Sequence, residues 1–180
     1  MEIVKTRIPD LVIIKPKVYN DSRGYFFESY NKDEFHKIGL YDSFVQDNES
    51  KSNKGVLRGL HFQNAPFAQG KLVRVMHGAV LDVAVDLRKN SPTYGKWESV
   101  ELNHDNKWMY WIPPGFAHGF VTLEDHTVFF YKCTNIYNKE SEGSIQWNDP
   151  DLNIDWKIDN PTLSDKDKSG PLFKDFKSLF

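Results

Sequence analysis

The chain has 180 residues, 39% of them hydrophobic and 27% charged, which predicts one soluble globular domain spanning residues 1–180. With 23 basic and 25 acidic residues and no long basic run, nucleic acid is not expected as a partner. No apolar run of about 18 residues is present, so no membrane contact is expected. The start lacks a signal-peptide pattern, and the single cysteine, Cys133, fits a cytoplasmic location.

The elements predicted in chain order are mostly strands. Residues 3–16 form an apolar, β-prone segment, and residues 31–39 read as a short helix ended by Gly39. Residues 71–88 contain two strands joined by a turn at His77-Gly78. A second short helix is predicted at 171–180, after Pro171. Further short strands, separated by turn residues, are predicted at 96–102, 108–113, 118–123 and 127–133.

Many short strands at roughly regular spacing predict a sandwich or barrel. Residues 134–170, rich in Asn, Asp and Pro, are expected to cross over that barrel in an ordered path. In the second strand of 71–88, the apolar side chains Leu81, Val83, Val85 and Leu87 alternate with Asp82, Ala84 and Asp86. This period of two predicts a sheet covered on one face. Paired carboxylates also occur in glycosidases, but a structural role for Asp82 and Asp86 is favoured.

The stretch "LRGLHFQ" at 57–63 carries Arg58, His61 and Gln63 within an apolar run. Residues three apart face opposite sides of a regular strand, so Arg58 and His61 would not share a pocket there. A bulge at Gly59 would bring them to the same side; alternatively, Arg58 reaches round the rim. The sequence leaves both options open.

Two spaced motifs resemble those of metal-binding cupins, which are small β-barrels. Gly55, His61 and Gly78 fit the first motif, and Pro113, Gly115 and His118 fit the second. However, Gln63 stands at the second histidine position and Lys71 at the glutamate position. An ammonium group repels a divalent cation and attracts an anion, so no metal is expected.

A longer series of stretches resembles the dTDP-4-dehydrorhamnose 3,5-epimerase family, in order over roughly residues 3–168. The resemblance implies a mainly β fold: a cupin, or double-stranded β-helix, jelly-roll barrel with a few short helices. It implies a homodimer without cofactors that converts a dTDP-linked 4-keto-6-deoxyhexose for the synthesis of L-rhamnose, a component of cell-surface polymers. The matching stretches are "DSRGYFFESY", "FVQDNES", "GVLRGLHFQ", "AQGKLVRVMHGAVLDVAVDLR", "SPTYGKW", "WIPPGFAHGF", "YKCTNIY", "EGSIQWNDP" and "LSDKD".

The chemistry of the implied reaction assigns roles to individual residues. Protons at C3 and C5 are removable because both carbons flank the C4 ketone. His61 suits the base, with Asp167 or its competitor Asp165 holding the other ring nitrogen. Lys71 suits the stabiliser of the enolate oxygen, and Tyr131 suits the acid on the opposite face.

The resemblance also implies a set of substrate contacts. Tyr137 matches an aromatic residue that stacks on thymine, and His118 matches a contact on the sugar side. Arginines suit phosphate oxygens because their donors form a planar fork. The full set is Arg23, Glu28, Gln46, Asn48, Arg58, Lys71, His118, Tyr137, Glu142 and Lys166.

Three other functions remain open at this point. The first is a single-carbon 3- or 5-epimerase acting on a related nucleotide-linked 4-keto sugar. The second is a sugar-nucleotide-binding cupin without catalysis, against which the set His61, Lys71 and Tyr131 argues, because binding alone needs no opposed acid and base. The third is a metal-dependent cupin oxygenase, which stoichiometric bound iron or zinc would reveal.

Overall fold

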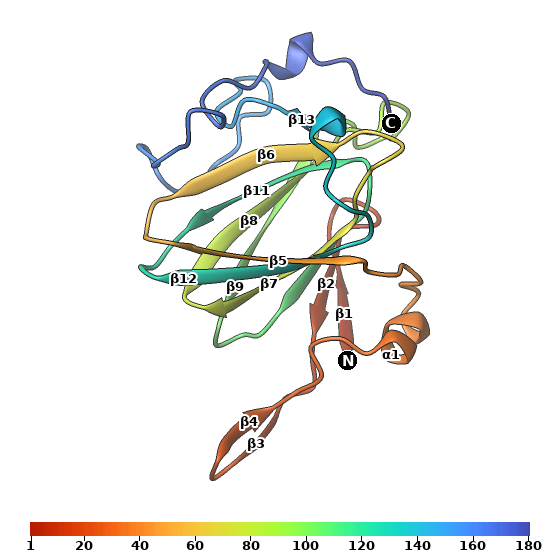
Figure 1. Ribbon diagram of the computed structural model, residues 1–180, viewed down its shortest axis with the longest axis vertical. Helices are drawn as coiled ribbons and strands as arrows, with labels where there is room; N and C mark the ends of the chain where they lie inside the picture. Colours follow the sequence, from red (N-terminus) through yellow and green to blue (C-terminus); the bar gives the residue numbers. More distant parts are fainter.

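The computed structural model describes residues 1–180, and most of its strands form two facing antiparallel sheets (Figure 1). This arrangement confirms the predicted mainly β jelly-roll barrel. The six-stranded sheet runs in the order β1 (Glu2–Lys5), β2 (Val12–Lys15), β10 (Met109–Ile112), β7 (Lys71–His77), β12 (Thr127–Cys133) and β5 (Gln46–Ser52). The five-stranded sheet runs β13 (Glu142–Ser144), β6 (Leu57–Gln63), β11 (Phe116–Thr122), β8 (Ala79–Asp86) and β9 (Trp97–Asn103).

The barrel interior is filled by apolar side chains from both sheets. Phe129 of β12 stacks on Phe120 of β11 with ring centroids 4.0 Å apart, so the two sheets meet through their aromatic residues. Val73, Ala84 and Tyr110 complete this contact and are completely buried. Phe120, and Tyr131 packed against this core, also line a polar cavity, so the core ends where that cavity begins.

The short helix predicted at 31–39 is α1 (Lys32–Lys37). The side chain of Asn31 accepts hydrogen bonds from the backbone N–H groups of Asp33 and Glu34, and Gly39 follows the helix with φ of 86°. Phe35 packs against the outer face of the six-stranded sheet. No helix of the structure is long and apolar enough to cross a membrane.

The prediction of a helix at 171–180 is wrong, because only a 3₁₀ turn, η2 (Phe173–Asp175), forms there. The residue before this turn, Leu172, supplies no capping side chain, and a helix this short is marginal without support. The chain instead stays largely extended, so that Phe173, Phe176 and Phe180 all reach the outer face of the five-stranded sheet. Packing on the sheet outweighs local helix preference here.

The prediction that one face of β8 would be left uncovered is also wrong. Val83, Val85 and Leu87 pack under Leu152 and Trp156, from the segment that crosses the outer face of the five-stranded sheet (Figure 1). The opposite face, which carries Asp82, Ala84 and Asp86, points into the barrel and is completely buried. The polar side of the alternating pattern is therefore the barrel interior, where each carboxylate has partners.

Strand β6 contains the irregularity that the spacing of Arg58 and His61 requires. His61 pairs with His118 and Arg58 pairs with Phe120, so only Gly119 of β11 lies opposite Gly59 and Leu60. Gly59 has a φ of 140°, and a Cβ atom added to it would lie 2.5 Å from the Cα atom of Gly119. A bulge between two glycines thus brings Arg58 and His61 to the same cavity.

Besides α1 and η2, a hairpin and a second 3₁₀ turn lie outside the barrel sheets. The hairpin of β3 (Tyr19–Asp21) and β4 (Gly24–Phe26) projects away from the barrel (Figure 1). A 3₁₀ turn, η1 (Lys139–Ser141), leads into β13 at the rim.

Candidate active site

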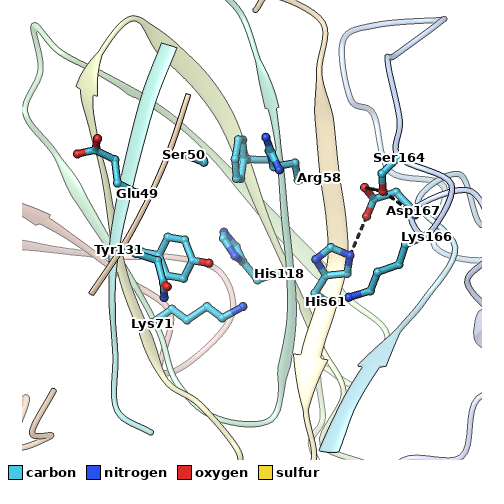
Figure 2. Close-up of a pocket in the computed structure, with 12 residues that line it drawn as sticks. Glu49, Ser50, Arg58, His61, Lys71, His118, Tyr131, Ser164, Lys166 and Asp167 are labelled. Atoms are coloured by element: carbon cyan, nitrogen blue, oxygen red, sulfur yellow. Dashed lines mark hydrogen bonds and ion pairs between the residues drawn. The ribbon is translucent and has the colours of Figure 1, made fainter. Parts of the chain in front are cut away.

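A cavity of about 420 Å³ lies between the two sheets, and residues from both line it (Figure 2). The lining is mostly polar, with Phe120 and Tyr131 as its aromatic members. Strands β5, β6, β7, β11 and β12 and the loop at 164–167 each contribute. The lining residues are Asn48, Glu49, Ser50, Arg58, His61, Lys71, His118, Phe120, Tyr131, Ser164, Lys166 and Asp167.

One wall of the cavity carries a histidine–carboxylate pair. The Nε2 atom of His61 lies 2.7 Å from Oδ1 of Asp167, so Nδ1 is the ring nitrogen left for a ligand. Asp167 also accepts hydrogen bonds from Ser164 Oγ at 2.6 Å and from the Gly59 backbone. Burial alone would raise the pKa of the Asp167 carboxyl. The contacts of the carboxylate with His61 and Ser164 have the larger effect and lower this pKa to about 2. The competitor Asp165 is exposed and pairs with Lys168.

The opposite wall carries Tyr131 and Lys71, on neighbouring strands β12 and β7 (Figure 2). Burial raises the pKa of the Tyr131 phenol to about 12, so the hydroxyl keeps its proton at neutral pH. Burial lowers the pKa of Lys71, whose ammonium lies 5.8 Å from the centre of the Tyr131 ring. Lys71 has no carboxylate within ion-pair distance, which leaves its charge available to a ligand.

A second buried histidine–carboxylate pair lies deeper in the cavity. The Nε2 atom of His118 is 2.9 and 3.0 Å from the two oxygens of Asp82, and Asp82 is completely buried. Burial lowers the pKa of His118, so the imidazole is neutral at the cavity. Sequence reasoning treated Asp82 as structural and missed this contact. The position of Asp82 on the polar face of β8 was the sequence signal that could have indicated this contact. Asp86 has the expected structural role, because it accepts hydrogen bonds from Arg88, Ser91 and Thr93.

Cations and polar groups continue from the cavity to its rim. Arg58 contacts Ser52 and has no carboxylate partner, whereas Lys166 pairs with Glu142. The hydroxyl of Tyr137 donates to Glu142 at 3.2 Å. Gln46 bonds both Asn48 and the backbone N–H of Tyr137. The predicted contacts Gln46, Asn48, Arg58, Tyr137, Glu142 and Lys166 therefore form one continuous surface with the cavity.

Two predicted contacts do not reach the cavity. Arg23 lies on the turn of the projecting hairpin, with 88% of its side chain exposed, and pairs with Asp21. Glu28 follows the hairpin and accepts a hydrogen bond from Asn31. Sequence similarity alone could not show this separation, because a matching stretch does not state where its side chains lie relative to the cavity.

Comparisons with known proteins give one consistent result. A family model described as dTDP-4-dehydrorhamnose 3,5-epimerase matches residues 5–175. A dTDP-4-dehydrorhamnose 3,5-epimerase from Shigella flexneri is 55% identical, over 97% of this chain and 97% of that protein.

Two solved structures are similar to the whole barrel. One is a dTDP-6-deoxy-D-glucose-3,5-epimerase from Legionella pneumophila in complex with dTDP-4-keto-L-rhamnose. It has 49% identity and a TM-score of 0.94 and covers 98% of this chain and 94% of that chain. The other is a dTDP-4-dehydrorhamnose 3,5-epimerase from Bacillus anthracis with TDP and PPi bound. It has 46% identity and a TM-score of 0.94 and covers 96% of this chain and 99% of that chain.

Proposed function

The chain belongs to the dTDP-4-dehydrorhamnose 3,5-epimerase family, and from that premise we propose how its cavity acts as an isomerase on a dTDP-linked 4-keto sugar. The reaction epimerises dTDP-4-dehydro-6-deoxy-D-glucose at C3 and C5 and yields dTDP-4-dehydro-L-rhamnose. The observation that carries this proposal is the placement of His61 and Tyr131 on opposite walls, with Lys71 beside the second (Figure 2).

Removal of the first proton is assigned to His61. The C–H bond beside the ketone breaks, its proton goes to Nδ1 of His61, and the electron pair moves onto the C4 oxygen as an enolate. Asp167 holds Nε2 and stabilises the imidazolium that forms. Lys71 stabilises the enolate oxygen, since its half-buried side chain reaches the cavity and no carboxylate lies within ion-pair distance of its nitrogen.

Return of a proton from the other side completes the inversion. Tyr131 donates its phenolic proton to the opposite face of the same carbon, and the enolate electrons re-form the ketone. Proton exchange with solvent then resets His61 and Tyr131 before the second carbon reacts. The carbon gains as many protons as it loses, so these residues accomplish the epimerisation without an oxidant or reductant.

We assign the diphosphate to Arg58 and Lys166 and the base to Tyr137. Arg58 offers a planar set of donors that matches phosphate oxygens, and no carboxylate competes for it. Tyr137 exposes 53% of its surface at the rim, where an aromatic face can stack on thymine. His118 is assigned to the sugar, because it lies between His61 and Tyr131 in the cavity (Figure 2).

We also propose a homodimer in which the β3–β4 hairpin of one copy reaches the cavity of the other. The hairpin stands off the barrel and exposes 54–66% of Tyr19, Tyr25 and Phe26, and a two-stranded ribbon of this kind is marginal alone. This arrangement would deliver Arg23 and Glu28 to a substrate. Light scattering should give twice the chain mass of 21.0 kDa, and a monomer at micromolar concentration would exclude this arrangement.

The cytoplasm remains the proposed location. Cys133 is a free, buried thiol, as is usual in a reducing compartment. Cell fractionation that recovered the protein outside the cytoplasmic fraction would contradict it.

The experiment that tests the function is proton NMR of dTDP-4-dehydro-6-deoxy-D-glucose with the wild-type protein in D₂O. Deuterium is expected at both C3 and C5, with formation of the L-rhamno product. Exchange at one carbon alone would instead indicate the single-carbon epimerase, and absence of exchange would leave a binding protein.

A further inference from the structure

Gln63 follows His61 on the same face of β6, yet its carboxamide does not enter the cavity. The side chain is 5% exposed and all its bonds go to backbone groups of two loops. Its Nε2 group donates to the carbonyl oxygen of Phe67 at 2.6 Å and to that of Ile136 at 3.1 Å. Its Oε1 atom accepts from the backbone N–H of Asn138 at 2.8 Å.

These bonds lie on either side of Tyr137. The carbonyl of the preceding residue and the N–H of the following residue are both held by Gln63, while Gln46 accepts the N–H of Tyr137 itself at 2.8 Å. Two side-chain amides therefore fix the backbone of three consecutive residues. The segment has no strand or helix of its own at 134–138.

The ring that this backbone carries is exposed but fixed in direction. The Tyr137 hydroxyl donates to Glu142, which pairs with Lys166 at the cavity. Asn138 fixes the next part of the chain. Its side chain caps η1 by accepting a hydrogen bond from the backbone N–H of Ser141, which directly precedes Glu142. An exposed aromatic face that is already held in place loses little conformational entropy when a base stacks on it.

Loss of the Gln63 carboxamide would release this segment. Two carbonyl groups and one N–H group would lose buried partners, and such groups are costly to leave unsatisfied. They would recover partners by moving toward water, and Tyr137 would move with them. Arg58 is held by Ser52 and has no contact with this segment, and the ion pair of Lys166 with Glu142 uses a carboxylate oxygen other than the one that accepts from Tyr137, so both cations would stay.

We propose that Gln63 is a positioning residue for nucleotide recognition: its carboxamide fixes the backbone on both sides of Tyr137 and so presents the ring to the base of the substrate. This inference rests on the proposed function, in which Tyr137 contacts thymine. It predicts that Gln63 affects ligands that carry a base and not the isolated diphosphate.

Calorimetric titration of the full-length protein with dTDP and with pyrophosphate tests this prediction. The variant Gln63→Met keeps the length of the side chain and removes its three hydrogen bonds, and its Kd for dTDP is expected to rise about tenfold, since stacking on one base is worth about 1–3 kcal/mol. Its Kd for pyrophosphate should stay within about twofold. Gln63→Glu keeps the acceptor for Asn138 but turns an acceptor-only carboxylate oxygen toward the carbonyl oxygens of Phe67 and Ile136, which it repels, so its loss of dTDP affinity should be at least as large.

Gln69→Met is the matched control. Gln69 also donates to a backbone carbonyl of this loop, that of Asn135, but this carbonyl lies outside residues 136–138. It should bind both ligands like the wild type. Hydrogen exchange of residues 136–138 should accelerate in Gln63→Met and not in this control. Unchanged dTDP affinity in Gln63→Met, or an equal loss for dTDP and pyrophosphate, would overturn the inference alone. Failure of the wild type to bind dTDP would overturn the proposed function as well.

Discussion

Replacing His61 by asparagine is expected to lower the rate of deuterium entry at C3 and C5 by about a thousandfold, within the range of a lost general base. Asparagine is smaller than histidine and places its carboxamide near the position of Nδ1, while Asp167 keeps its hydrogen bonds from Ser164 and the Gly59 backbone, so the cavity walls should stay in place. We assign the same base to both carbons, so exchange at C3 and at C5 should fall together. Proton NMR of the dTDP-linked 4-keto sugar in D₂O measures both rates in one sample.

The variant Asp167→Asn tests how much the carboxylate beside His61 contributes to the rate. It leaves the imidazole in place but removes the carboxylate 2.7 Å from Nε2, and it should cause a smaller loss than His61→Asn. The pKa of Asp167 is about 2, so this carboxylate is charged at every pH above about 4. The lower exchange rate of Asp167→Asn relative to the wild type should therefore be seen throughout the neutral pH range. Exchange that survived His61→Asn at either carbon would point to a second base, with His118 the nearest candidate.

The sequence predicted those parts of the fold in which apolar residues alternate. Strands β8 and β9 follow this pattern, and β7, β10, β11 and β12 were indicated by short apolar runs between turn residues; all six form close to the expected positions. The strand β5, "QDNESKS", was not expected, because its residues have low strand preference. It forms because all seven residues pair with β12, so tertiary pairing outweighs local preference.

The site was predictable only in part for a similar reason. Arg58 and His61 could be recognised from one short stretch, but their shared direction depends on a bulge at Gly59, which the sequence offered as one of two options and which only the pairing with Gly119 of β11 decides. The contact of His61 with Asp167 joins residues far apart in the chain, so only family similarity could suggest it. The contact of Asp82 with His118 follows from the pairing of β8 with β11, which period-two patterning does not specify.

Replacing Tyr131 by phenylalanine is expected to separate proton exchange from inversion. The variant keeps the ring that packs on Phe129 but removes the hydroxyl that we assign as the acid. Formation of the epimerised product should fall about a hundredfold or more. Deuterium should still enter the starting sugar, because His61 can return a solvent-derived deuteron to the face from which it took the proton.

The measurement is the ratio of exchange to inversion in D₂O, followed by NMR for the wild type and for Tyr131→Phe. Affinity for dTDP serves as the control for intact binding, since the assigned base and diphosphate contacts do not include this hydroxyl. Equal loss of exchange and inversion would mean that Tyr131 is needed to remove the proton. Inversion at the wild-type rate would place the acid elsewhere.

The architecture of the barrel is the reason to expect this separation. His61 belongs to β6 of the five-stranded sheet, and Tyr131 belongs to β12 of the six-stranded sheet, so a sugar carbon between them meets a different group on each face. The His61 side chain is 27% exposed, so water can reach it and exchange protons with it. Burial raises the pKa of the Tyr131 phenol to about 12, so this hydroxyl keeps its proton until the enolate takes it. A single residue acting alone on one wall can exchange the hydrogen, but it cannot invert the carbon unless the substrate turns over in the cavity.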